Sequence, residues 1–189
     1  MRKYAGLLYA AGVMCMLLVV SGCAHNRQPE ANPYEKMSKA DMKYKNIQIV
    51  NFTVSSNGVQ ENDNPNEILA EAQAACVTTL TESKLFETVK TVSGAEKDNS
   101  TLLVQGELRK LRIVGGGARF WIGAMAGKSE MAVYVKLINA STGSVVTESN
   151  VRDDSNPYSG AWSVGASDRA LPAQVGSLIA DLVINVSKK

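Results

Sequence analysis

Histidine is nearly absent from this sequence, which has a single copy, His25, close to the N-terminus. Catalytic schemes and metal sites that need an imidazole inside a folded domain are therefore excluded, and we expect no metal and no cofactor. A strong excess of one charge is also missing, because 20 Lys and Arg face 18 Asp and Glu. Without Arg2 and Lys3, which precede an apolar run, the two signs balance. This removes the electrostatic reason to expect nucleic acid as a partner.

The apolar run at residues 5–20 is shorter than the roughly 20 residues that a transmembrane helix needs. It follows Arg2 and Lys3, and the small residues Ser21 and Gly22 lead from it to Cys23. This order predicts a signal peptide, residues 1–22, with cleavage after Gly22 and lipid attached to Cys23. The alternative is an uncleaved anchor with an incidental cysteine.

The residues after the predicted cleavage site indicate where the mature protein goes. Two or three acyl chains on Cys23 suffice for stable anchoring. The next residue, Ala24, is not the Asp that enteric-type sorting uses for retention, so we expect a lipid anchor in the bacterial outer membrane with the folded domain in the periplasm. Residues 23–43 are polar, contain two prolines and predict a flexible tether. The folded domain is expected at residues 44–189.

Cysteine is scarce, and its three copies leave no disulfide. Cys15 leaves with the leader and Cys23 carries the lipid, so Cys76 alone remains in the mature chain. Cys76 falls on a predicted helix among small residues and is expected to behave as a buried apolar side chain. A reactive thiol is the alternative.

Hydrophobic periodicity predicts strands and helices over most of the remaining sequence. Helices are expected at residues 65–83 and 169–186, and strands at 45–54, 85–92, 101–114, 129–139 and 144–152. The order β-α-β-β-β-β-α predicts an α+β fold, with an antiparallel-rich mixed sheet of about five strands and two helices packed on one face. A change of face near Arg109 and Lys110 predicts a β-bulge. Leu178 falls in the apolar stripe of the last helix, so Leu178→Asp is expected to prevent folding.

The glycine-rich segment at residues 115–129 is the most unusual stretch. A phosphate-binding loop is excluded because Ile122 stands where the motif needs glycine, and because a strand rather than a helix should follow. Two hypotheses stay open. In the first, the segment is a connection whose aromatic residues pack on the core. In the second, it is an interaction element in which Gly123 and Gly127 let a backbone or a bilayer approach, while Arg119, Phe120 and Trp121 contact the partner.

Two weaker features are a basic cluster and an aromatic loop. Arg109, Lys110 and Arg112 are expected to lie on a solvated strand face. Residues 156–163 combine turn residues with Tyr158 and Trp162. This loop either binds a partner or glycan, or covers the edge of the sheet.

Taken together, the sequence from Val20 to Cys23, the spacing Gly117-x-Arg119-x-x-x-Gly123-x-x-x-Gly127 and the Thr142-Gly143 hairpin resemble bacterial lipoproteins of the domain of unknown function 4410 family. The likeness covers residues 47–182. The family is similar to the periplasmic α+β domains of curli-secretion lipoproteins and of lipoproteins that activate penicillin-binding proteins. The resemblance implies no catalytic residues.

These observations favour a lipoprotein that is not an enzyme and whose periplasmic domain binds protein, as a component or adaptor of an envelope assembly or by self-association. One alternative is a cell-wall-active enzyme that uses only carboxylates, which would need two of them in one cleft. Another alternative is an oligomeric pore-forming lipoprotein.

Overall fold

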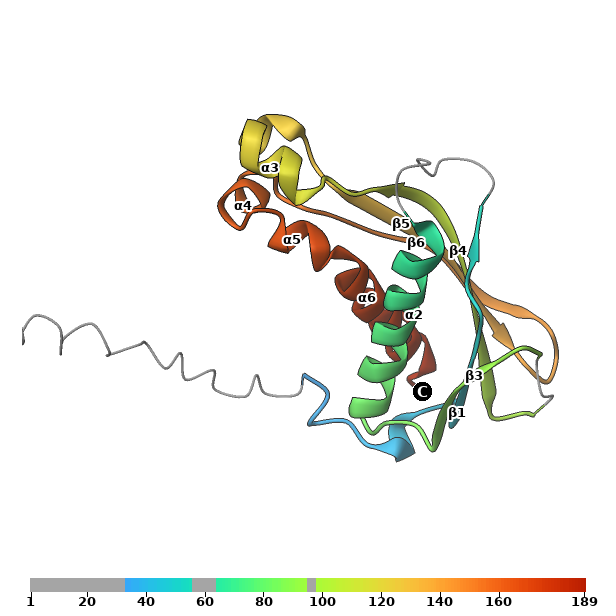
Figure 1. Cartoon of the computed structure of the whole chain (residues 1–189). Helices are drawn as coiled ribbons and strands as arrows, with labels where there is room; N and C mark the ends of the chain where they lie inside the picture. The colour runs from blue at the N-terminus through green and yellow to red at the C-terminus, as the bar shows by residue number, and fades with distance from the viewer. Residues whose placement is uncertain (1–32, 56–63, 95–97) are drawn as a thin grey trace, which may run out of the picture. The chain divides into compact units, whose positions relative to one another are not determined.

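A six-stranded sheet and two long helices form two layers (Figure 1). The computed structural model describes residues 33–55, 64–94 and 98–189, so the signal peptide, Cys23 and the first part of the predicted tether lie outside the described residues. The strands are β1 (Asn46–Val50), β2 (Thr53–Val54), β3 (Thr88–Val92), β4 (Thr101–Arg112), β5 (Glu130–Asn139) and β6 (Val145–Asp154). The α-helices are α2 (Pro65–Glu82), α3 (Gly116–Ile122), α4 (Pro157–Trp162), α5 (Ala166–Arg169) and α6 (Leu171–Ser187), with short 3-10 turns η1 (Lys39–Asp41) and η2 (Gly123–Ala126). None of the helices in the described part is long and apolar enough to cross a bilayer.

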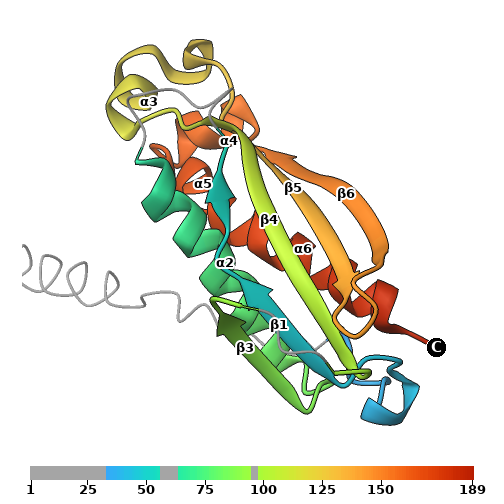
Figure 2. The same ribbon diagram turned by 90° about the vertical axis from the view of Figure 1, so that its right-hand side faces the viewer.

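The strand order is β3-β1-β4-β5-β6, with β2 beside β4. β1 is parallel to both β3 and β4, whereas β4, β5 and β6 pair antiparallel and supply the longest ladders. Figure 2 shows β3 and β6 at the two edges of the sheet. The predicted α+β class, with an antiparallel-rich mixed sheet and helices on one face, is confirmed.

The first predicted strand is divided, whereas the predicted bulge is confirmed. Between β1 and β2 the backbone N–H of Phe52 donates to Gln73 Oε1 of α2 at 2.8 Å, which takes the strand out of its ladder. The ring of Phe52 lies over Gly106, where an added Cβ would stand 2.7 Å from the ring. The register of β4 against β5 shifts between Leu108 and Lys110, as the change of face predicted.

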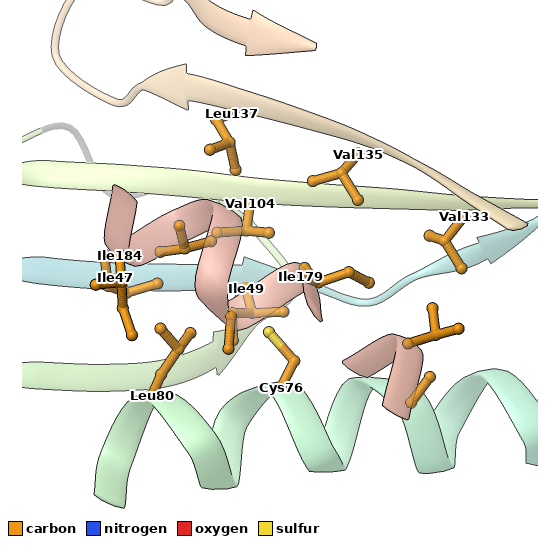
Figure 3. Packing of buried hydrophobic residues seen from close by; sticks show 14 of the residues in the cluster. Ile47, Ile49, Cys76, Leu80, Val104, Val133, Val135, Leu137, Ile179 and Ile184 are labelled. Carbon is orange, nitrogen blue, oxygen red and sulfur yellow. The ribbon is translucent and has the colours of Figure 1, made fainter. Parts of the chain in front are cut away.

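The core lies between the sheet and the helices α2 and α6 (Figure 3). β1, β4 and β5 contribute alternate aliphatic residues, and the two helices cover them. Residues labelled in Figure 3 are Ile47, Ile49, Cys76, Leu80, Val104, Val133, Val135, Leu137, Ile179 and Ile184. Cys76 is fully buried, as expected, and burial raises the pKa of its thiol to about 12.

The orientation of α6 differs from the prediction. Its buried face includes Gly176 and Ala180 besides Val175 and Ile179, whereas Leu178 is 40% exposed. The prediction that Leu178 lies in the core was wrong. The physical reason is that α6 packs on α2 as well as on the sheet, and the closest approach uses small residues. A stripe drawn through the large residues alone is therefore rotated away from the true contact face.

The predicted boundary between tether and domain also lies too late in the chain. Met42 and Tyr44 are buried, and Met42 forms an antiparallel bridge with Lys188 at the end of α6. Further upstream, the Tyr34 hydroxyl donates to Asp181 of α6. The part of the predicted tether from about residue 34 onward therefore packs against the domain.

Candidate functional site

Six large apolar side chains are exposed together at one end of the described domain. We call this group the aromatic tip; it consists of Phe120, Trp121, Ile122, Met125, Tyr158 and Trp162. Four of them come from α3 and η2 and two from α4, and these elements lie side by side beyond the start of α6 (Figure 1). Phe120 and Trp121 make an edge-to-face contact with ring centroids 5.2 Å apart. Exposed apolar groups of this kind mark binding surfaces more often than isolated exposed residues do.

The glycines of the segment shape the tip from within. Gly123 ends α3 with φ of 56° and Gly127 ends η2 with φ of 87°, conformations that favour glycine. An added Cβ on Gly123 would lie 3.9 Å from Ala161 Cβ of α4. Gly123 lies beside α4 and both glycines end helical turns, while the hypothesis that they admit an external partner stays a prediction.

The second half of the tip begins with a regular helix cap. The side chain of Asn156 accepts a hydrogen bond from the backbone N–H of Tyr158 at 2.9 Å, and Pro157 occupies the first turn of α4. After α4, Val164 has φ of 48°, a strained conformation for a β-branched residue. Tyr158 and Trp162 are 71% and 90% exposed. The alternative in which they cover the edge of the sheet was wrong.

A buried ion pair fastens the two halves of the tip to each other. Arg119 of α3 donates from Nε to Asp168 Oδ2 at 2.9 Å and from Nη2 to Asp168 Oδ1 at 2.7 Å, and both side chains are fully buried. Arg119 Nη1 also donates to the carbonyl of Gly127 at 2.7 Å. This two-point geometry fixes the relative orientation of α3 and α5. Gly160 of α4 packs closely against the ion pair, since an added Cβ on this residue would lie 2.6 Å from Arg119 Nε.

Two serines connect the ion pair to the end of the sheet. The hydroxyls of Ser129 and Ser155 donate to Asp168 Oδ1 at 2.7 and 2.5 Å. Ser129 Oγ also accepts from the backbone N–H of Val114 at 2.8 Å, just beyond β4. Burial by itself would raise the pKa of Asp168, but the hydrogen bonds from Arg119 and the serines outweigh it and lower the pKa to about 2. Asp168 is therefore ionised at neutral pH, and its contacts hold Arg119, Ser129 and Ser155 in place.

The predicted interaction residues thus separate into two groups. Phe120 and Trp121 are exposed, which contradicts packing on the core, whereas Arg119 is only 2% exposed and cannot contact a partner directly. Including Arg119 in a contact surface was wrong; it positions the helix that displays Phe120 and Trp121. Asp168, Ser129 and Ser155 were missed as its partners. Asp168 is the only carboxylate in residues 155–170, a signal that could have identified it.

Within the described residues, no cluster of His, Cys, Asp and Glu is suited to hold a metal ion. The basic cluster lies on a solvated face, as predicted, with Lys110 bound to Glu130 at 2.9 Å and Arg109 bound to Glu107 at 3.3 Å. Arg112 donates to the carbonyl of Ala126 in η2, although its side chain remains exposed.

Comparison with known proteins places the chain in a family and a fold. Residues 30–156 match the family described as a domain of unknown function (DUF4410). No curated protein matches the sequence. Among solved structures, a PelC L103M dodecamer from Paraburkholderia phytofirmans is similar, with a TM-score of 0.50 and 17% identity over 78% of this chain and 90% of that one. A DUF330 protein from Xanthomonas campestris has a TM-score of 0.51 and 11% identity over 76% of this chain and 85% of that one. Because the family match covers most of the sequence, the chain belongs to the DUF4410 family.

Proposed function

We propose that this protein is a lipoprotein anchored in the outer membrane, whose periplasmic domain binds protein as a component or adaptor of an envelope assembly. The anchor rests on the sequence from Val20 to Cys23, where small residues precede a cysteine after a short apolar run. The match to the DUF4410 family begins at residue 30, after Cys23, so the proposed anchor rests on this sequence pattern alone.

The observation that carries protein binding is the edge strand β6. It is ten residues long, and in the described part of the chain it pairs with β5 alone. Its first residues, Val145 and Val146, are 48% and 37% exposed. An open edge with exposed aliphatic side chains is a site where a strand of another chain can add to the sheet. Because Glu148 and the charged residues at 152–154 disfavour pairing further along, we place the contact at the Val145 end.

The fold of the domain supports an assembly role. PelC of Paraburkholderia phytofirmans, which has a similar fold, was solved as a dodecamer. A domain of this shape with one open edge can assemble with further copies or with another protein, and both arrangements satisfy the proposal.

One carboxylate, Asp168, is unavailable to the alternative of a hydrolase that uses only carboxylates. Both oxygens of Asp168 are occupied by Arg119, and Oδ1 also receives Ser129 and Ser155. A hydrolase that uses only carboxylates would need a pair open to substrate in a cleft. Asp168 is committed to internal contacts and cannot supply one member of such a pair.

Crosslinking in living cells tests the binding surface. A photoreactive amino acid at Val146 is expected to give crosslinked products, while the same group at the exposed residue Glu71 of α2 gives none. Val146→Lys should reduce co-purification of whichever protein is crosslinked. Equal crosslinking at the two positions, or none at Val146, would contradict binding at β6.

Fatty-acid labelling tests the anchor separately. Cells that express the full chain are given a clickable fatty acid, and the label is expected on the wild-type protein only. The Cys23→Ser variant should stay unlabelled and unprocessed, because only this thiol follows the small residues. Label on the variant would exclude the proposed anchor.

A further inference from the structure

We propose that the aromatic tip inserts into the interface of the lipid bilayer that holds the anchor. The inference goes beyond the proposed function, in which β6 contacts protein, and it rests on that function only for the lipid on Cys23. The tip would act as a second, non-covalent contact that fixes how the domain sits against the membrane.

The side chains of the tip have the chemistry of a bilayer interface. Trp121, Trp162 and Tyr158 combine an apolar ring with a polar N–H or O–H, the combination that favours the headgroup region. Ile122 and Met125 add purely apolar area. Both tryptophans of the whole chain lie in the tip.

The charge around the tip also suits a lipid surface. The two segments that build it, residues 113–129 and 155–170, contain a single carboxylate, Asp168, which is buried against Arg119. Of the two remaining charged residues of these segments, Arg169 is an exposed cation, and Lys128 pairs with the exposed Asp154 of β6 at 2.6 Å. The tip therefore approaches phosphate-bearing headgroups without exposed negative charge of its own.

The tip projects outward. Trp121, Met125 and Trp162 are 82%, 91% and 90% exposed, so their side chains are almost fully open to solvent. A hot spot of a protein interface gains its affinity by filling a complementary pocket, whereas a bilayer accepts any projecting apolar group. The Arg119–Asp168 pair holds the helices in place before contact, so insertion does not require the tip to fold on the membrane.

The length of chain before the domain allows both contacts at once. Tyr34 is held by Asp181 in the middle of α6. From Asp181 to Leu171, at the tip end of α6, the helix rises about 15 Å. Between Cys23 and Tyr34 the chain can span up to about 36 Å when extended. A lipid on Cys23 can therefore lie in the same bilayer that the tip touches.

Intrinsic fluorescence provides a direct test, because both tryptophans report on the tip. The protein used is the chain from residue 23 with Cys23→Ser, which has neither leader nor lipid and keeps every core residue, since these lie between residues 34 and 186. Vesicles of phosphatidylethanolamine and phosphatidylglycerol are expected to shift its emission to the blue. Vesicles that contain brominated phosphatidylcholine are expected to quench it. Binding should persist at high salt, because most of it is apolar.

Substitutions that keep both tryptophans test whether the apolar side chains of the aromatic tip contact the bilayer. Ile122→Ser combined with Met125→Ser is expected to weaken partition into vesicles about tenfold or more. The control is Leu178→Ser, which removes a partly exposed aliphatic side chain from α6, away from the tip, and should leave partition unchanged. Thermal unfolding of each variant verifies that the fold is retained.

Two results would overturn the inference. One is an emission spectrum that stays unchanged, and unquenched by brominated lipid, at saturating vesicle concentrations. The other is a blue shift that depends on protein concentration and needs no lipid, which would make the tip a surface between proteins. Neither result depends on whether Cys23 carries lipid in cells, so the failure of this inference is distinguishable from failure of the proposed anchor.

Discussion

Replacing Asp168 by Asn tests whether the Arg119–Asp168 ion pair holds the two halves of the aromatic tip together. The substitution keeps the shape of the side chain but leaves the Arg119 guanidinium buried without a counter-charge. Loss of one partner from a fully buried pair costs about 3–5 kcal/mol in the free energy of unfolding. A domain is stable by only about 5–15 kcal/mol, so the change is a large fraction of the total.

The same pair predicts a pH dependence with a defined sign. The pKa of Asp168 is about 2 in the folded protein, below its ordinary value of 3.8. A lowered pKa stabilises the fold above about pH 4, and this contribution is lost as the pH falls from 4 to 2. The difference between these two pKa values corresponds to about 2–3 kcal/mol in the free energy of unfolding. Asp168→Asn has no carboxylate to protonate, so the gap in stability between it and the wild type should narrow over this range.

Urea unfolding at pH 7 and at pH 2.5, followed by far-ultraviolet circular dichroism, measures both effects. Asp154→Asn is the control, since it breaks an exposed ion pair with Lys128 and should change stability little. A loss below about 1 kcal/mol for Asp168→Asn, or a gap that does not change with pH, would refute the reasoning.

Three further predictions concern the core. Gly176→Ala should destabilise the domain by about 3 kcal/mol in urea unfolding, because the new Cβ would stand 2.2 Å from the backbone oxygen of Ala72; unchanged stability would show that α2 and α6 are further apart. Cys76 should resist alkylation by iodoacetamide until the protein is unfolded, since its thiol is buried and its pKa is raised to about 12; rapid labelling of the native protein would contradict its burial. Ile179→Asp should abolish soluble folded protein while Leu178→Asp is tolerated, because Ile179 is fully buried and Leu178 is 40% exposed; equal yields of the two would place the contact face of α6 elsewhere.

Local patterns in the sequence predicted much of the sheet. The hairpin of β5 and β6 and the bulge at Arg109 follow from alternation and its interruption, which depend only on neighbouring residues. The glycine-rich segment was less predictable. Glycine weakens every regular pattern, so α3 and η2 gave no periodic signal. Gly123 and Gly127 adopt positive φ and end these two elements.

The Arg119–Asp168 ion pair could not be predicted from local sequence patterns, because its two residues are far apart in the chain. Arg119 and Asp168 are separated by 49 residues, and nothing in either segment indicates which charge the other will meet. The prediction of the orientation of α6 was wrong for a related reason. Burial of Gly176 depends on the surface of α2 opposite it, and a hydrophobic stripe read from one helix contains no information about that surface.

The pairing of Arg112 with Glu130 has a consequence for how the domain is organised. These residues are cross-strand partners at the ends of β4 and β5, so a tight turn of a few residues would be enough to connect them. Residues 113–129 are therefore an insertion into an ordinary β-hairpin, longer than chain closure needs. The sheet can tolerate a different insertion at this place, and a shortened hairpin offers a version of the domain that keeps the core between sheet and helices but lacks the first half of the aromatic tip, including Arg119, the partner of Asp168.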